Sequence, residues 1–455
     1  ETDDLLADAE AGFAVLPGFL GADGKRNYLI GMQNPAELRG TGGAMLQFAL
    51  LSIDRGRPRL SKKASTVYDV DKNRQPIDLP LPPDAWYQEI PDARRFGNAN
   101  WSPDWPFAAQ LTIRYAAATQ PNFPHIDGVL LVDPVVMKDL MPGVGRFRSS
   151  KYGVYVTGDT VENYLLYRAY AAKPVPHVRR ARLRDVVDDF YAHMLKPDHP
   201  SELVRGFGHA LATKHMQVWL ADPAEERYLK RMKWDGALDK AANSDYLDVV
   251  QQNVGGNKLD YHAAMNTTMD VVPQGADAHV TTTVEIRNGV FLPQPRWALG
   301  NSGPNHRPMV NVYVPENAEL SHATVEGDRI DLAAEGIAAW SGDRPAEHLE
   351  LGKKVWSVVL GDAGAVPPGM PPDSTYGVTY DYSVPGAVTT RGGRSVYRLV
   401  LQHQPKAHPE TFRLRLTLPE GAHDVHAKGF ARRHGSLVWE HSLTSDEVLE
   451  VSWHD

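Results

Sequence analysis

Residues 26–43, RNYLIGMQNPAELRGTGG, join a short apolar segment to a polar, glycine-rich loop. The apolar part, Arg26 to Met32, predicts a buried strand, and the loop follows it directly. Glycines let backbone N–H groups approach an anion, and Arg39 adds a permanent bidentate donor for phosphate or carboxylate. We therefore expect a substrate-binding loop at the end of this strand, formed by Asn34, Thr41, Gly42 and Gly43 around Arg39.

The same loop lacks the features of two common phosphate-binding motifs. No Gly-Lys-Ser/Thr follows it, so it is not a Walker loop, and it precedes a second apolar run, Ala44 to Ile53, rather than a helix. A purely structural role therefore stays open with equal weight. In that interpretation the loop is a tight connection, and Glu37 and Arg39 only pair with their neighbours.

A second polar loop runs from Asn98 to Pro106, immediately before an expected helix at Phe107–Thr119. The N–H groups at a helix N-terminus favour an anion or a sugar phosphate, so Asn98 and Asn100 are candidate substrate-binding residues. The alternative is that Ser102 or Asp104 caps the helix and that the two indoles of the loop are buried. We favour capping for Asp104 and substrate binding for the two asparagines.

A run of arginines, Arg179-Arg180-Ala181-Arg182-Leu183-Arg184, opens the expected helix Val178–Leu195. At 3.6 residues per turn, Arg179 lies along the apolar stripe of this helix, whereas Arg184 points outward toward Asp188. An inward arginine needs a partner, and a phosphate or pyrophosphate would be one. A solvated surface run is the alternative, and we favour it for Arg184 but not for Arg179.

The composition excludes several classes of protein. A net charge of −8 over 455 residues argues against a general nucleic-acid binder. The absence of Cys excludes disulfides, thiolate metal sites and a Cys nucleophile. No apolar run reaches the ~18–20 residues that span a bilayer, and there is no signal peptide. Because the sequence starts at Glu1, within an expected helix at Asp3–Phe19, we expect a longer protein whose membrane anchor would lie upstream.

The pattern of expected elements changes near Ser244. Before it, apolar strands such as Gly128–Val132 alternate with helices, which predicts an α/β domain over residues 1–243. Beyond it, strand-like alternation dominates residues 244–455, which predicts a β-rich region of one or two sandwich modules. The expected strands there are Tyr261–Met269, Val280–Arg287, Val310–Val314, Val355–Leu360, Tyr376–Tyr382, Tyr397–Gln402, Phe412–Leu418 and Leu437–His441.

Other candidates are weaker. The histidines are scattered without metal-ligand spacing, and His209 and His215 are interpreted as structural. Asp127 and Asp133 flank the strand Gly128–Val132, where capping is the favoured role. No Gly-x-Ser-x-Gly elbow is present.

Four stretches resemble an uncharacterised extracytoplasmic family of Gram-positive bacteria, domain-of-unknown-function family 4012. They are Tyr28 to Gly43, Asn98 to Asp104, Asp127 to Pro134 and Asn257 to Tyr261. The resemblance covers most of residues 20–290.

That family is similar, more distantly, to the LytR-CpsA-Psr proteins. These are membrane-anchored enzymes that transfer glycopolymers from polyprenyl pyrophosphate to peptidoglycan, with arginines around the pyrophosphate and a magnesium ion held by aspartates. The resemblance implies an α/β/α sandwich with a mixed sheet, followed here by the β-rich region. By position, the family's arginines and asparagine match Arg39, Asn98, Arg179, Arg180 and Arg182.

The resemblance implies an extracytoplasmic phosphotransferase or pyrophosphatase that acts on a polyprenyl-linked glycan. Arg39 and Arg179 would stabilise charge on the phosphate. Glu37 or Asp104 would serve as base or as Mg²⁺ ligand. However, Gly40 and Thr41 stand where the transferases keep a metal-binding aspartate. A non-catalytic glycan or lipid-carrier binding protein, or a scaffold with envelope-assembly partners, is therefore the alternative.

Overall fold

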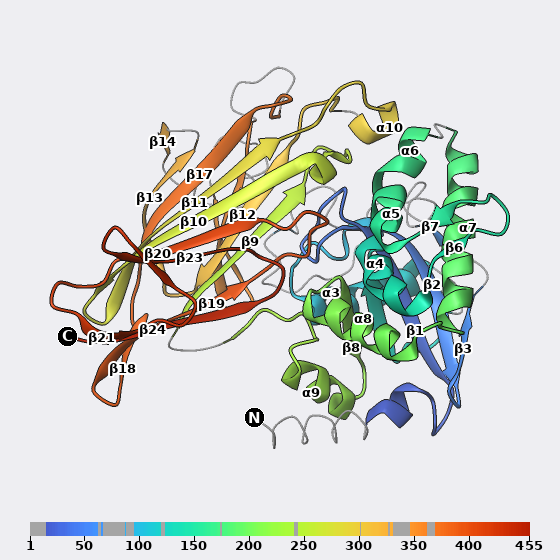
Figure 1. Cartoon of the computed structure of the whole chain (residues 1–455), viewed down its shortest axis with the longest axis horizontal. Coiled ribbons are helices and arrows are strands. Elements are labelled where there is room, and N and C mark those ends of the chain that lie inside the picture. Colours follow the sequence, from blue (N-terminus) through green and yellow to red (C-terminus); the bar gives the residue numbers. More distant parts are fainter. Residues whose placement is uncertain are drawn as a thin grey trace. The chain divides into compact units, whose positions relative to one another are not determined.

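The computed structural model describes residues 15–61, 65–66, 87, 95–119, 123–172, 175–240, 244–300, 302–325, 328–330, 346–361 and 369–455. The chain divides into two compact units, drawn in Figure 1. Unit 1 comprises Glu1–Pro80 and Pro91–Ala237, and unit 2 comprises Leu81–Ile90 and Leu238–Asp455. The structure is mixed α/β with a β-rich C-terminal region, as the sequence predicts.

A mixed sheet forms the centre of unit 1, with the strand order β3-β2-β1-β5-β8 and β4 paired to β2. The strands are β1 (Arg26–Asn34), β2 (Ala44–Asp54), β3 (Arg57–Leu60), β4 (Ser65–Thr66), β5 (Gly128–Val132) and β8 (Met216–Leu220). β1 and β5 are parallel neighbours, and the other pairs are antiparallel. The carboxyl ends of β1 and β5 therefore meet at one edge, where ligand sites of α/β proteins commonly form.

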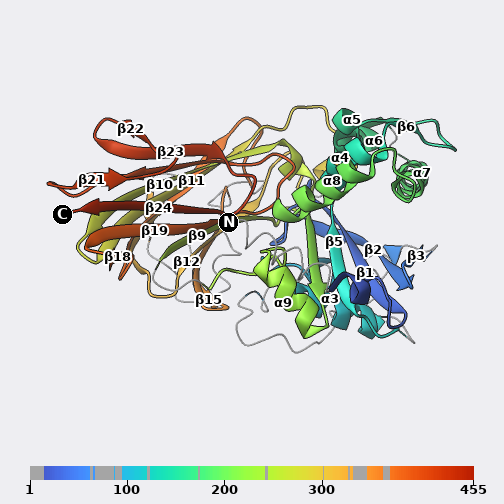
Figure 2. The ribbon, with the colours of Figure 1, turned by 60° about the horizontal axis from the view of Figure 1, so that its bottom comes forward.

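Unit 1 also contains helices, some of which contact the sheet. They are α3 (Trp105–Thr119), α4 (Pro134–Val144), α5 (Gly158–Asn163), α6 (Ala169–Ala172), α7 (Pro176–Met194), α8 (Pro200–Ala212) and α9 (Pro223–Arg231). Figure 2 shows α4, α5, α6 and α8 grouped on one side of β1, β2 and β5. Asp133 caps α4 through a 2.7 Å bond from the Val135 N–H, with Pro134 at the first helical position, which confirms the predicted start of this helix.

The helical segment from Gly158 to Ala172 is interrupted. A π-helical turn, Tyr164–Arg168, joins α5 to α6, and the short hairpin β6 (Phe147–Arg148) and β7 (Tyr155–Val156) precedes it. Of the expected N-terminal helix, residues 15–19 are helical and residues 1–14 lie outside the described part of the chain. Among the described residues, no helix combines the length and apolar character needed to cross a membrane.

Unit 2 contains two large sheets packed face to face. One has the order β14-β13-β17-β11-β10-β20-β23-β22, and the other β15-β16-β12-β9-β19-β24-β21 with β18 on β19. Side chains from both sheets share one apolar core, which includes Val280, Val284, Trp356 and Tyr380. The parallel pairs β10–β20 and β9–β19 make both sheets mixed.

The strands of unit 2 are β9 (Asp245–Asn253), β10 (Ala263–Gln274), β11 (Asp277–Asn288), β12 (Pro308–Pro315), β13 (Glu319–Val325), β14 (Asp328–Ile330), β15 (Ala346–Glu350), β16 (Lys353–Val359), β17 (Thr375–Val384), β18 (Val388–Arg391), β19 (Arg394–Gln402), β20 (Thr411–Leu416), β21 (His423–His426), β22 (Ala431–Arg433), β23 (Ser436–Ser442) and β24 (Glu447–His454). A 3₁₀ turn, Leu259–His262, precedes β10, and the short helix α10 (Arg296–Leu299) follows β11.

Candidate functional site

The loop between β1 and β2 is closed by its own hydrogen bonds. Asn34 Oδ1 accepts the Ala36 N–H at 3.0 Å, and the Glu37 carbonyl accepts the Ala44 N–H at 2.6 Å. Asn34 is buried, and so is almost every residue of the loop. The polar groups at the carboxyl end of β1 are thus held inside unit 1.

Arg39 lies at the centre of this loop and is bonded to the protein through three of its nitrogens. Its Nε donates to Asn98 Oδ1 at 2.8 Å, and Nη1 donates to the Leu38 carbonyl at 2.8 Å. Nη2 forms an ion pair with Glu37 Oε1 at 3.3 Å, and the guanidinium lies 5.8 Å from the centre of the Trp101 ring. The structure therefore brings Arg39, Glu37 and Asn98 together.

Thr41 and Asn100 form the second half of the same network. Asn100 Nδ2 donates to Thr41 Oγ1 at 2.8 Å and to the Gly43 carbonyl at 2.7 Å. The Thr41 carbonyl accepts from the side-chain amides of Gln33 and Gln217, at 3.1 and 2.9 Å. Asn100 Oδ1, in contrast, is buried and has no hydrogen-bond partner among the described residues.

The glycines of the loop have a packing role in the structure. A Cβ on Gly40 would lie 2.2 Å from the Trp101 carbonyl oxygen, and one on Gly43 would lie 2.5 Å from the Asn34 carbonyl carbon. Gly42 has φ +114°, which side-chain-bearing residues rarely adopt. Close packing thus accounts for glycine at positions 40 and 43, and the backbone angle accounts for it at position 42. Approach of a ligand to these glycines stays a prediction.

Asp104 serves as the cap of α3. Its Oδ1 accepts the Phe107 N–H at 2.9 Å, which is the role that the sequence favours. Within the described ranges, no three His, Asp or Glu side chains are placed so that they could hold a metal ion. Binding of Mg²⁺ by Asp104, which the resemblance implies, stays a prediction.

Two of the predicted arginines of α7, Arg179 and Arg182, form a separate group in which each stacks on a tyrosine. The Arg179 guanidinium lies 4.6 Å from the centre of the Tyr170 ring, and that of Arg182 lies 5.3 Å from the Tyr152 ring. Burial raises the pKa of the Tyr164 hydroxyl, and the neighbouring Arg182 opposes that rise. These side chains are all partly exposed. They come from α6, α7, the π-helical turn and the β6–β7 hairpin, and we call them the arginine–tyrosine group.

The electrostatics of this group favour an anion. Burial lowers the pKa of Arg179 despite the attraction of Tyr170, and the exposed Arg180 lowers it further. Asp185, on the same helix, accepts the N–H groups of Lys151 and Tyr152 at 3.1 and 2.9 Å. Burial opposes the charge of Asp185, but these and other hydrogen bonds outweigh it and lower the pKa. This carboxylate is therefore satisfied by the hairpin loop.

The predicted site residues thus fall into two groups with different neighbours. Arg39, Glu37, Asn98, Asn100 and Thr41 bond to one another around the β1–β2 loop. Arg179 and Arg182 instead stack on Tyr170 and Tyr152, which belong to other elements of unit 1. A single cleft lined by both groups stays a prediction.

A buried Asp–His pair at the same sheet edge was missed by the sequence interpretation. His215 Nδ1 lies 2.7 Å from Asp133 Oδ2, and the imidazole keeps only 10% of its surface exposed. Burial lowers the pKa of His215, but Asp133 more than offsets this, so the net shift is upward. The pairing of β5 with β8 places the two residues opposite each other, and their separate positions in the sequence carry no signal of that pairing.

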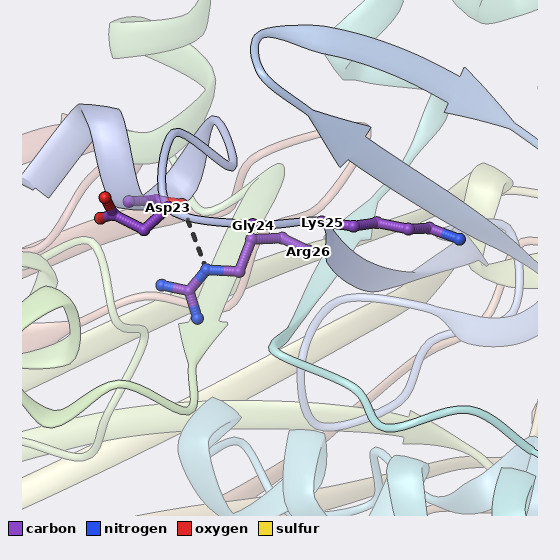
Figure 3. Close-up of a pocket in the computed structure, with 5 residues that line it drawn as sticks. Asp23, Gly24, Lys25 and Arg26 are labelled. Carbon is purple, nitrogen blue, oxygen red and sulfur yellow. Dashed lines mark hydrogen bonds between the residues drawn. The ribbon is translucent and has the colours of Figure 1, made fainter.

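A surface pocket lies at the opposite end of β1, where the strand begins (Figure 3). The Arg26 guanidinium there donates to the Gly18 carbonyl at 3.1 Å and pairs with Glu225 at 2.6 Å and with Asp127 at 3.2 Å. Its charge is therefore already balanced by the protein. None of the predicted site residues lines this pocket, whose lining residues are Gly18, Asp23, Gly24, Lys25 and Arg26.

Residues 23–170 match the family model described as "Protein of unknown function (DUF4012)". This segment contains the β1–β2 loop, Asn98, Asn100 and Asp104, but it ends before the arginines of α7. The match supports the predicted resemblance to that family over this part of the chain. No curated protein matches the chain in sequence.

Solved structures offer only distant similarity. Native leukotriene A4 hydrolase from yeast, Saccharomyces cerevisiae, has a TM-score of 0.24 at 9% identity, covering 42% of this chain and 29% of that protein. Aminopeptidase A from Legionella pneumophila, solved with aspartic acid, has a TM-score of 0.24 at 8% identity, covering 42% and 21%. The chain thus spans less than a third of their length, and scores this low carry no argument. The likeness to the LytR-CpsA-Psr fold stays a prediction.

Proposed function

We propose that the chain is a non-catalytic cell-envelope protein that binds a polyprenyl-phosphate-linked glycan through its phosphate groups. The observation that carries the proposal is the arginine–tyrosine group, in which Arg179 and Arg182 stack on Tyr170 and Tyr152. An extracytoplasmic location, a membrane anchor beyond this sequence and envelope-assembly partners rest on the family resemblance alone and belong to the same proposal.

The geometry of this group is suited to phosphate. Residues three apart on a helix lie on one face, so the two guanidinium groups point to the same side of α7. A guanidinium that stacks on an aromatic ring is held in one orientation, and the N–H donors along its edge have the geometry for bidentate bonds to phosphate oxygens. Arg180 is exposed beside them and adds a further positive charge.

Binding without catalysis is favoured because the predicted catalytic carboxylates have structural partners. Glu37 pairs with Arg39, and Asp104 caps α3. The phosphotransferase or pyrophosphatase remains the second candidate, and one observation favours it. The Asp133–His215 pair holds an imidazole in the arrangement that general acid–base catalysis uses.

A binding experiment separates the two functions. We expect geranylgeranyl pyrophosphate to bind the full chain equally well with Mg²⁺ and with EDTA, as measured by isothermal titration calorimetry. Arg179→Ala and Arg182→Ala should each weaken binding by about 10-fold or more, because charge-assisted bonds to phosphate are lost. Arg184→Ala, an exposed position on the same helix, is the matched control and should leave the affinity unchanged.

Two results would overturn the proposal. One is binding that the α7 variants do not affect, although thermal melts show them to be folded. The other is release of inorganic phosphate that depends on a divalent cation and is lost in His215→Gln, which would favour the enzyme instead.

A further inference from the structure

Four aromatic rings form a continuous row at one end of unit 2. The ring centres of His408 and Tyr261 are 4.8 Å apart, those of Tyr261 and His262 are 5.5 Å apart, and those of His262 and Phe291 are 5.3 Å apart. Phe291 is 55% exposed, His408 is exposed, and the two central rings are partly exposed. We call these four residues the ring row.

The centre of the ring row is anchored by a buried polar network. Asp260, which directly precedes Tyr261, accepts from Gln251 Nε2 and from Asn253 Nδ2, both at 2.6 Å. It also lies 2.8 Å from His306 Nε2, and neither side chain of this pair is exposed. Buried hydrogen bonds of this kind hold a backbone in one conformation, so the 3₁₀ turn that carries Tyr261 and His262 is well anchored.

The Phe291 end of the row is anchored in the same way. Asn288 Nδ2 donates to the Met370 carbonyl at 2.9 Å, and Asn288 Oδ1 accepts the Val290 N–H at 3.2 Å. The Gly289 N–H donates to the His262 carbonyl at 3.2 Å, which ties this loop to the 3₁₀ turn.

At the other end of the row, His408 lies in the sequence between two buried ionic residues, Lys406 and Glu410. Lys406 Nζ and Glu410 Oε2 are 3.5 Å apart, and both side chains are almost fully buried. This ion pair spans the segment from which the His408 ring projects. All four rings therefore stand on loops that buried polar contacts hold in place, and a binding surface gains affinity when it is ordered in advance.

We infer that the ring row is a binding site for the sugar rings of a glycan. A pyranose has an apolar C–H face that packs on an aromatic ring and a rim of hydroxyl groups. Neighbouring rings in the row are tilted or perpendicular, so the row offers both aromatic faces and ring edges, and the imidazole nitrogens and the phenol are placed among them as hydrogen-bonding groups. The inference rests on the proposed function in taking a glycan as the ligand, but it assigns the sugar part to unit 2.

The charge state of the row agrees with a neutral ligand. Burial, together with the neighbouring His408, lowers the pKa of His262, so its imidazole is neutral at physiological pH. A neutral ring can both donate and accept a hydrogen bond, as a sugar hydroxyl requires.

The test uses the full chain and an array of phosphate-free bacterial saccharides, followed by titration of the strongest binder. Phe291→Ala and Tyr261→Ala should each reduce the affinity by about 10-fold or more. Leu292→Ala is the matched control, because Leu292 is also 55% exposed but contributes no ring. We expect it to bind as the parent does, whereas equal loss in all three variants would show that the rings are not what binds the saccharide and would overturn the inference.

Failure of this inference and of the proposed function can be distinguished. Arg179→Ala should keep full binding to phosphate-free saccharides while losing geranylgeranyl pyrophosphate. Saccharide binding without pyrophosphate binding would leave the ring row supported and reject the phosphate site. If no saccharide on the array binds, or if Phe291→Ala binds like the parent, the ring row is not a glycan site.

Discussion

Replacement of Gly40 by alanine should destabilise unit 1 by about 3 kcal/mol. The new Cβ would lie 2.2 Å from the Trp101 carbonyl oxygen and 2.5 Å from the Ser102 carbonyl carbon. Real Cβ contacts stay above 3.0 Å, so the two backbone segments would have to separate by about 0.8 Å. Overpacking costs about 1–3 kcal/mol, and the upper end applies because the obstacle is backbone rather than a flexible side chain.

The assay is differential scanning calorimetry, with the two units fitted as separate transitions. For a domain of this size, 3 kcal/mol corresponds to a fall in Tm of about 6–12 °C. Gly208→Ala is the control, because this helical glycine has open space around its Cβ position. The Gly208→Ala substitution should stabilise unit 1 by about 0.5–1 kcal/mol, because alanine is more favourable than glycine inside a helix.

One outcome would refute the packing explanation for Gly40. If Gly40→Ala unfolds at the parent temperature while its affinity for geranylgeranyl pyrophosphate falls, the glycine serves ligand approach, as the sequence alone first indicates. The β1–β2 loop would then be part of the site rather than its support.

Two further predictions concern pH. The pKa of His215 is raised by Asp133, so the stabilisation from this pair is fully present below the unfolded pKa of about 6.5 and is lost as pH rises through the folded pKa. His215→Gln should therefore lower Tm more at pH 6 than at pH 9, and an equal loss at both would contradict this. Burial raises the pKa of Glu226 to about 7, so the folded state binds the extra proton and stability falls as pH rises from about 4.5 to 7. Glu226→Gln should raise Tm at pH 8 and change it little at pH 4.5, and calorimetry at the two pH values checks the difference.

The sequence predicts well those features that depend on neighbouring residues. The strand Gly128–Val132, the cap Asp133 and Pro134 after it are found as expected, because a short apolar run followed by an N-cap is a local signal. The pair formed by Glu37 and Arg39 is likewise only two residues apart.

Features that depend on distant partners could not be predicted. Strand β9, DYLDVVQQN, has no alternation, yet all nine of its residues are buried. Its polar side chains are tolerated because their partners come from elsewhere in the chain: the Asp245 carboxylate accepts the Tyr397 hydroxyl, and the Gln251 amide donates to Asp260. For the same reason the sequence does not predict that His215 lies beside Asp133, because only the pairing of β5 with β8 brings the two residues together.

The polar residues of the β1–β2 loop, which the sequence singles out as a candidate site, are the ones that make the most hydrogen bonds within the fold. Arg39 and Thr41 are bonded on several sides by protein groups, and a polar side chain so engaged has little left to offer a ligand. Arg179 and Phe291 differ, because an aromatic neighbour orients each while part of its surface stays exposed. A ligand gains most from side chains that the protein already orders and whose surface it can still reach. This contrast favours the α7 face and the ring row over the β1–β2 loop as the places where the chain meets its ligand.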